Sequence, residues 1–320
     1  MISASSASTT GGVLVIGSIT ADVTTFSRRL PAPGETILGD DFTLVLGGKG
    51  ANQAVASALA GADTQMVGCV GTDLFQKLTR GTLSELGVDV SAVRIVDGPT
   101  GVAHIRVDAT GENDIVMVPL ANSHLGIDDV DAGIRAAKGR ATVLLTQLET
   151  PVDVTSHAIR AGRAAGLTVV LDPAPAAPVE DDLWASVDIV TPNETEARLI
   201  TGIDVVDVES AMAAGGWFVA RGVGQAVVTL AAQGVVVVDA DGARHVPAPE
   251  VTAIDTTAAG DAFAGYLGAG LSRGLSLDDA LPRAMAAGAL AVTRRGASPS
   301  LPEATAVDAF LEETQKERTH

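Results

Sequence analysis

The sequence has little that could crosslink the chain or bind a metal through sulfur. Its 320 residues include one cysteine, Cys69, which lies in an apolar run. A single cysteine excludes a disulfide within the chain, which fits a reducing compartment and favours a cytoplasmic protein. Paired CxxC motifs and the HExxH motif are also absent, so no zinc site is predicted. We therefore expect Cys69 to be a small, buried hydrophobic residue.

Two phosphate-binding patterns and all membrane-spanning patterns are missing as well. No GxxxxGK precedes a Ser or Thr, which excludes a P-loop enzyme, and no GxGxxG follows a predicted strand. No apolar run is long enough to span a bilayer. Residues 1–11 are rich in Ser, Thr and Ala but have neither a basic start nor an apolar core. They are predicted to be a disordered N-terminal tail and not a secretory signal.

Basic and aromatic residues are scarce. The chain has 21 Lys and Arg against 39 Asp and Glu, a net charge of −18, and only 3% of its residues are aromatic. Nucleic-acid binding needs a basic face, so no nucleic-acid partner is predicted. In contrast, 47% of the residues are hydrophobic, which is ample for the core of one large α/β domain with a small appendage.

Continuous apolar runs predict strands that are buried on both faces and alternate with helices, as in a parallel sheet. Helical periodicity is found at 74–86, with Gly87 as its C-cap, and at 277–293 and 303–313. The predicted domain covers residues 12–315, and 316–320 are predicted as a polar tail. The predicted strands are 13–17, 66–70, 142–147, 168–171, 187–190, 226–230 and 235–239.

A second, smaller sheet is predicted from segments that interrupt this alternation. Apolar and polar residues alternate over 103–107, a turn follows at 108–113, and 115–118 is again apolar. This is the pattern of an antiparallel hairpin with one polar face. We expect segments 18–24, 35–46 and 101–118 to form a separate sheet that covers the ligand site as a lid.

The stretch from Asp255 to Asp261 predicts a loop that turns into a helix. Small residues precede Asp261, so backbone N–H groups can approach a ligand closely, and the first turn of a helix attracts anions. A carboxylate at such a place makes sense if the anion is a phosphoryl group in transfer and Asp261 takes a proton from the attacking hydroxyl. The alternative interpretation is an ordinary acidic residue that stabilises the helix dipole.

Two further polar sets follow the same logic. Asp22 comes just after the apolar run 13–17, where α/β proteins bind ligands, and is a candidate to hold a polar substrate. The motif Gly47–Gln53 combines a glycine turn, the cation of Lys49 and the amide of Asn52 at a helix start, which suits a polyol or a phosphate. The alternatives are a turn or cap aspartate and an ordinary glycine turn.

Acidic groups follow two later strands. Glu149 comes after the strand at 142–147, on the predicted ligand side of the sheet. Asn193 and Glu196 stand at i and i+3 of a predicted helix start and share a face, where their oxygens suit Mg²⁺ bound through water. Alternatively, Asn193 is the N-cap of that helix and the acids only favour its first turn; both roles are compatible.

Taken together, these motifs resemble the ribokinase-like (PfkB) family of carbohydrate kinases. The resemblance is carried by residues 47–53 and 255–261, is supported by residues 191–196, and extends from Gly17 to Ser300. It implies an α/β three-layer sandwich with a central, mostly parallel sheet and a small β-sheet lid. It also implies transfer of the ATP γ-phosphoryl group to a sugar hydroxyl, with Mg²⁺, and the ribokinase branch of the family points to D-ribose.

The resemblance also implies roles for individual residues. Asp261 matches the general base, and Ala258, Ala259 and Gly260 match the anion hole that stabilises the transferring phosphoryl group. Asn193 and Glu196 match the motif that orders Mg²⁺ and phosphates. The positions that match sugar-binding residues are Thr20, Asp22, Gly48, Lys49, Asn52, Glu149 and Asp261.

Nucleotide, potassium and dimer contacts are implied in the same way. A homodimer through the lid is expected, because pairing lids would cover an exposed sheet edge. The nucleotide positions are Asn193, Thr229, Leu230, Ala231, Ala232, Gln233, Gly234, Gly260 and Met285. The positions for an activating monovalent cation, usually K⁺, are Asp255, Thr257, Ala291, Arg294, Gly296 and Ser300, many through backbone carbonyls.

Three positions depart from the family pattern. Thr20 stands where Asn is usual, which leaves open 2-deoxyribose or another sugar as the substrate in place of ribose. Ala231-Ala232 replaces Gly-Ser, and Met285 replaces a His near adenine. A nucleoside is disfavoured by the scarcity of aromatic residues for base stacking. A catalytically silent sugar sensor is the alternative from another class, but a sensor would not need Asp261 and its anion hole.

Overall fold

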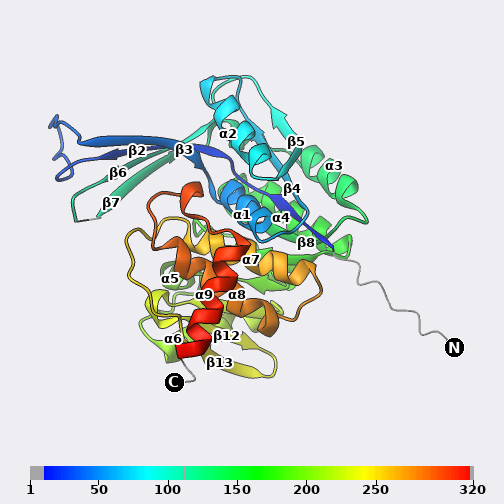
Figure 1. Ribbon diagram of the computed structural model, residues 1–320. Coiled ribbons are helices and arrows are strands. Elements are labelled where there is room, and N and C mark those ends of the chain that lie inside the picture. The colour runs from blue at the N-terminus through cyan, green and yellow to red at the C-terminus, as the bar shows by residue number, and fades with distance from the viewer. Residues whose placement is uncertain (1–10, 111, 318–320) are drawn as a thin grey trace.

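The computed structural model describes residues 11–110 and 112–317 (Figure 1). Residues 1–10 of the predicted N-terminal tail and 318–320 of the predicted polar tail lie outside the described residues. Within the described part, no helix combines the length and the apolar character needed to cross a bilayer. Cys69 is fully buried, as predicted.

A nine-stranded sheet forms the centre of the molecule, in the order β13-β12-β11-β10-β9-β8-β1-β4-β5. The strands pair in parallel except β12, which is antiparallel to both of its neighbours. The carboxyl ends of the parallel strands therefore lie along one edge, where ligands bind in such sheets. The strands are β1 (Gly12–Ile16), β4 (Thr64–Val70), β5 (Asp89–Ile95), β8 (Ala141–Thr146), β9 (Thr168–Leu171), β10 (Ile189–Val190), β11 (Gln225–Thr229), β12 (Val235–Asp239) and β13 (Gly242–Val246).

Helices cover both faces of this sheet, so its central strands are apolar throughout. Along β1, Val13 and Val15 pack into one hydrophobic cluster with α1, α7 and α8, whereas Leu14 and Ile16 pack into another with α3 and α4. The helices are α1 (Lys49–Leu59), α2 (Leu74–Glu85), α3 (Ile127–Ala137), α4 (Val152–Ala164), α5 (Glu194–Thr201), α6 (Val208–Val219), α7 (Ala259–Ser272), α8 (Leu277–Ala291) and α9 (Ala304–Glu317), with 3-10 turns η1 (Leu120–His124), η2 (Asp181–Ser186), η3 (Ala231–Gln233) and η4 (Ser298–Ser300).

The second sheet has four strands in the order β3-β2-β6-β7 and projects from the body of the molecule (Figure 1). Its strands are β2 (Thr20–Phe26), β3 (Asp41–Gly47), β6 (Gly101–Val107) and β7 (Asn113–Val118). One face carries exposed apolar side chains, with Phe42 at 57%, Val116 at 60% and Val118 at 43% exposure. At its base β2 begins at Thr20, opposite Gly47 of β3, so the lid is rooted next to the Gly47–Gln53 motif.

Most predicted elements are present, and the differences have local causes. Residues 35–40, predicted as part of a lid strand, are not in a strand; β3 begins only at Asp41. The sequence analysis did not predict β5 and β13, which carry many polar residues because both border solvent at the outer positions of the sheet. Helix α9 continues to Glu317 and so includes residues 316 and 317 of the predicted tail.

Candidate active site

The start of α7 is left open by the backbone that precedes it. Ala258 adopts a left-handed conformation (φ 59°, ψ 11°) and no side chain caps the helix. Within the described residues, the backbone N–H groups of Gly260 and Asp261 have no hydrogen-bond acceptor. A Cβ added to Gly260 would meet no atom within 4 Å, so there is free space beside these amides. Two unpaired amides and the positive end of the helix dipole make this turn suitable for an anion.

The carboxylate of Asp261 is buried at 5% exposure and is fixed by two consecutive residues of α1. Asn52 Nδ2 donates to its Oδ2 at 2.9 Å, and Gln53 Nε2 donates to its Oδ1 at 3.1 Å. Donors to both oxygens fix the orientation of the carboxylate, which a general base needs in order to accept a proton from a bound hydroxyl. Asn52 Oδ1 is buried and has no partner, so it can accept a hydrogen bond from a ligand hydroxyl.

Lys49 places a cation among several carboxylates. Its Nζ lies 3.6 Å from Asp172 Oδ2, and the side chain of Lys49 retains 29% exposure. Burial alone would lower the pKa of Lys49, but the carboxylates of Asp172, Asp261, Glu149 and Glu196 raise it, so the ammonium stays charged. Burial raises the pKa of Asp172, opposed by the charge of Lys49. The site thus contains one cation and an excess of buried acid.

The predicted sugar-binding residues surround this group. Ser18 Oγ donates to Glu149 Oε2 at 2.5 Å, and the Lys49 backbone N–H donates to the same oxygen at 2.9 Å. Gly48, at φ 89°, lies directly against the start of lid strand β2. A Cβ there would lie 2.9 Å from the Thr20 backbone nitrogen, so a side chain does not fit at this position. Ser18 and Lys49 therefore connect the start of α1 to Glu149 after β8.

Asp22 lies inside strand β2 of the lid, within the segment 18–24 that was predicted for the second sheet, and not in a turn or cap, which was the alternative. Thr20 Oγ1 donates to Asp22 Oδ1 at 2.7 Å, and both side chains are buried. Burial raises the pKa of Asp22 to about 6; the Thr20 hydrogen bond lowers it, and the charges of Glu149 and Asp261 raise it further. The departure at Thr20 thus supplies a hydroxyl donor to the carboxylate beside it.

Asn193 and Glu196 form a capping box at the start of α5. Asn193 Oδ1 accepts from the Glu196 N–H at 2.8 Å, and Glu196 Oε2 accepts from the Asn193 N–H at 2.9 Å. The structural alternative weighed for these residues is therefore present. Burial raises the pKa of Glu196, and its Oε1 has no donor among the described residues. One carboxylate oxygen remains for a second role.

The predicted nucleotide segment starts beside this box. Asn193 and Thr229 form an isolated parallel bridge, and the Thr229 N–H donates to the Pro192 carbonyl at 2.9 Å. Residues 230–234 then form a tight turn, in which Ala231 (φ 44°) and Gly234 (φ 98°) have left-handed backbones. Ala231, Ala232 and Gln233 are exposed. Met285 is on α8, buried at 8% exposure in the core cluster that includes β12.

Asp255 joins the two loops predicted to bind a monovalent cation. Its Oδ1 accepts from the N–H and hydroxyl of Thr257 at 2.9 and 2.6 Å, and its Oδ2 accepts from the Gly296 N–H at 2.8 Å. These hydrogen bonds lower the pKa of Asp255 despite its partial burial. Both oxygens accept from loop donors, so a cation there would depend largely on backbone carbonyls, as predicted for many of these positions.

Sequence reasoning missed four polar residues of the site: Ser18, Gln53, Gln147 and Asp172. Each could have been found, because Gln53 follows Asn52 in the same motif and the others directly follow buried strands. Gln53 Nε2 donates to Asp172 Oδ2 at 2.8 Å as well as to Asp261, and Gln147 Nε2 donates to Gln53 Oε1. The rule that polar residues at strand ends face ligands was applied to Glu149 but not to its neighbours.

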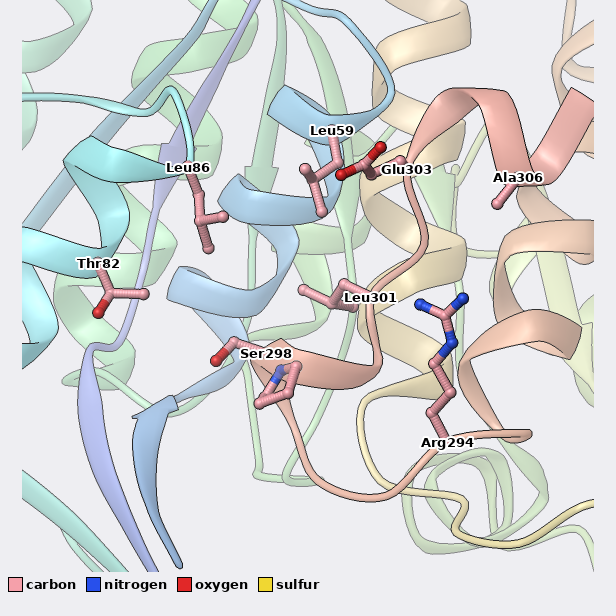
Figure 2. A pocket seen from close by; sticks show the side chains of 9 residues that line it. Leu59, Thr82, Leu86, Arg294, Ser298, Leu301, Glu303 and Ala306 are labelled. Carbon is pink, nitrogen blue, oxygen red and sulfur yellow. The ribbon is translucent and has the colours of Figure 1, made fainter.

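A separate pocket of about 470 Å³ lies between α1, α2, the 294–301 loop and the start of α9 (Figure 2). Leu59, Leu86 and Leu301 line it together with Arg294 and Glu303. Of the predicted site residues only Arg294 borders it, and none of the carboxylates or amides around Asp261 does. The chemistry of the side chains, and not the size of this pocket, therefore identifies the candidate active site.

Known proteins are similar to this chain in sequence and in fold. Residues 11–304 match the pfkB family of carbohydrate kinases. The ribokinase of Haemophilus influenzae is 40% identical over 93% of this chain and 97% of its own, and the deoxyribokinase of Salmonella typhi is 34% identical over 93% and 98%. The structure of Arabidopsis thaliana ribokinase complexed with ribose and ATP superposes with a TM-score of 0.85 at 32% identity, covering 94% of this chain and 98% of that one. The predicted α/β architecture with a large, mostly parallel sheet and a separate smaller sheet is confirmed.

Proposed function

Because the chain belongs to the pfkB family of carbohydrate kinases, we propose that it transfers the γ-phosphoryl group of ATP to the 5-hydroxyl of D-ribose, with Asp261 as the general base. One observation carries this proposal: the buried Asp261 carboxylate stands in the same helical turn as two backbone amides that have no partner. A proton acceptor and an anion site are thus combined within one turn, as phosphoryl transfer to a hydroxyl requires.

The chemical step follows from these positions. The sugar hydroxyl donates its proton to Asp261, and the oxygen bonds to the γ-phosphorus as the bond from phosphorus to the ADP oxygen breaks. The open N–H groups of Gly260 and Asp261 stabilise the charge of the transferring group, together with Ala258 and Ala259, which shape the turn. Lys49 supplies a cation among the carboxylates of the site.

Ribose is the sugar that the surrounding residues support best. Acceptors for sugar hydroxyls are available at Asp22, at Glu149 and at the unpartnered Asn52 Oδ1. Gly48 and Lys49 complete the proposed sugar site. Thr20 has one hydroxyl, and this hydroxyl already donates to Asp22. A contact to the sugar 2-hydroxyl that Asn makes at this position in the family can therefore be lost or replaced here. A 2-deoxyribose kinase is the second candidate, because a deoxyribokinase is among the relatives.

Mg²⁺ is expected to arrive with ATP and not to occupy a cage of protein ligands. Among the described residues, no cluster of three His, Cys, Asp or Glu could hold a metal ion. Mg²⁺ typically binds one or two carboxylates together with phosphates and water, and it neutralises phosphate charge in kinases. The free Oε1 of Glu196, beside Asn193, fits such a partial role. Thr229 to Gly234 and Met285 then border the nucleotide.

K⁺ activation is proposed on the loops that Asp255 joins. An ionised Asp255 fixes Thr257 directly before Ala258, so an ion held by carbonyls of residues 291–296 would act on the shape of the anion hole. Activity with K⁺ should exceed activity with choline as the sole monovalent cation. Equal activity with both would refute this part.

A homodimer through the lid is supported by the exposed apolar face that Phe42, Val116 and Val118 present. Covering such a face with a second copy would remove it from water. The single cysteine supports a cytoplasmic location. Sedimentation should show a dimer that Val116→Lys dissociates.

The experiment that tests the function is ADP release by purified protein with ATP, Mg²⁺ and K⁺. D-ribose, 2-deoxy-D-ribose, fructose and adenosine are compared. Turnover on ribose above all others supports the proposal, whereas preference for 2-deoxyribose identifies the second candidate and makes Thr20 the specificity residue. Ribose binding without turnover on any of the four would leave only the silent sugar sensor.

A further inference from the structure

A buried amide connects the two carboxylates at the centre of the site. Gln53 Nε2 donates to Asp261 Oδ1 at 3.1 Å and to Asp172 Oδ2 at 2.8 Å, so both of its protons are used on acids. Its orientation is unambiguous, because the side facing two carboxylates must be the NH₂ group. Its Oε1 accepts from Gln147 Nε2, which holds the amide from the other side.

Gln53 does not face the substrate. Its side chain is fully buried (0% exposed), whereas the adjacent Asn52 keeps an unpartnered Oδ1 toward the site. The helix around it is rigidly placed: Ser57 Oγ donates to the carbonyls of both Gln53 and Gly265, and a Cβ on Gly265 would lie 2.7 Å from the Gln53 carbonyl oxygen. Helices α1 and α7 are thus in close contact where Gln53 meets Asp261.

We infer that Gln53 is a positioning residue for the general base. Its amide, which Gln147 orients, holds the Asp261 carboxylate in one orientation and so keeps it available as a proton acceptor. The inference rests on the proposed function and deepens it. Asn52 and Gln53 each occupy one lone pair of a different Asp261 oxygen, and this fixes the direction of the lone pairs that remain.

The same amide separates two acids that would otherwise repel each other. Asp172 is paired with Lys49 at 3.6 Å, and Gln53 stands between that ion pair and Asp261. The other charged groups that act on or beside Asp261 are Asp22 on β2, Glu196 on α5 and Glu149 after β8. All three are acidic, so the neutral amide donors of Asn52 and Gln53 are the groups that hold the Asp261 carboxylate in place.

The test is the pH dependence of kcat in Gln53→Met, which keeps the volume but removes the donor. Without this donor, the Asp261 carboxylate loses one of the two hydrogen bonds that orient it. We expect the acidic limb of the kcat profile to move to higher pH, and kcat on the plateau to fall about tenfold or more. The KM for the sugar should change much less, because Gln53 does not contact it. Gln147→Met should move the limb in the same direction by a smaller amount.

Gln65→Met is the matched control. Gln65 is also buried, at 6% exposure, but lies on β4 at the amino end of the sheet, away from the site. It should lose stability comparably and leave the pH profile unchanged. A Gln53→Met profile that superposes on the wild type, or a Gln65→Met profile that moves equally, overturns the inference. If Gln53→Met does not fold, the Gln147→Met profile decides, and an unchanged limb there refutes the role.

A second measurement separates this inference from the proposed function. Carboxyl ¹³C titration of Asp-labelled protein, with Asp261→Asn for assignment, reports the pKa of Asp261 without any turnover. An upward shift in Gln53→Met in a protein inactive on every sugar would keep the positioning role and refute the kinase activity. No shift in an active enzyme would refute the positioning role alone.

Discussion

Helices α5 and α7 both begin at the ligand side of the sheet, but their first turns are completed in opposite ways. At α5, Asn193 and Glu196 exchange hydrogen bonds at 2.8 and 2.9 Å, so the turn is closed by its own side chains. At α7, no side chain caps the helix and the N–H groups of Gly260 and Asp261 have no acceptor. The closed turn stabilises the fold, and the open turn leaves its donors for a ligand.

This difference follows from the residue types at the two helix starts. Asn at N-cap and Glu at N3 are strong capping residues, whereas Ala258 cannot accept a hydrogen bond with its side chain. Ala258 is also left-handed, at φ 59°, a conformation that costs an alanine about 1–2 kcal/mol. Local strain and unpaired amides therefore occur together at α7, as is common where a site is prepared for a ligand.

The largest effect that should separate the two helix starts is that of Asp261→Asn. The variant keeps the shape but cannot accept the proton, so kcat should fall by about 10²–10⁴-fold while sugar binding is retained. ADP release and calorimetry measure the two quantities. Asp153→Asn is the control, since Asp153 is also in the first turn of a helix without a side-chain cap, α4. Wild-type turnover in Asp261→Asn would show that the base is assigned wrongly.

A second prediction concerns Asp22, a buried carboxylate with one hydroxyl donor where Asp261 has two amide donors. Its pKa is about 6 in the folded protein against 3.8 for a free aspartate, so the folded state binds the proton more tightly. The free energy of unfolding should therefore fall by about 3 kcal/mol as pH rises from 4 to above 6.

The Asp22→Asn variant should lack this loss and be more stable than the wild type above pH 6, but bind sugar more weakly. Urea unfolding at pH 4.5 and 7.5 measures the difference. A variant with the same pH dependence as the wild type would contradict the assignment to Asp22.

Gly260→Ala tests whether the open turn of α7 serves a ligand and not the fold. A Cβ at Gly260 meets no atom within 4 Å, and alanine in a helix is more stable than glycine by about 0.5–1 kcal/mol. Stability should therefore hold or rise, while kcat falls about tenfold because the methyl group occupies the phosphoryl space. In α6, Gly216 is equally free of neighbours, so Gly216→Ala should give the stability gain with no loss of kcat.

How much of this could be predicted from the sequence depended on whether a signal was local. Buried strands such as 13–17, the capping box at Asn193 and the loop before Asp261 are visible in consecutive residues, and the structure contains them. Segment 18–24, which contains Asp22, was predicted to join the lid, but the place of β2 between β3 and β6 was not visible, because these contacts are distant in the sequence.

The bridge made by Gln53 was hidden for the same reason. It depends on Asp172 and Asp261, which are 119 and 208 residues away along the chain. The motif that Gln53 shares with Asn52 marks it as a candidate, but no local pattern shows which two carboxylates it joins. The left-handed Ala258 was also unpredictable, since alanine gives no sign of a positive φ.

The smallest effects should come from α5, where the closed turn allows the cap and the metal role to be separated. Asn193→Ala removes the cap and should cost about 1 kcal/mol of stability. Asp207→Ala at the similar box of α6 should cost as much, with no effect on turnover.

Glu196→Gln keeps an oxygen for the Asn193 N–H, so stability should change little. Its loss of charge should raise the Mg²⁺ concentration for half-maximal activity severalfold. If Glu196→Gln needs no more Mg²⁺ than the wild type, Glu196 serves only as a cap, and α5 contributes to the fold alone.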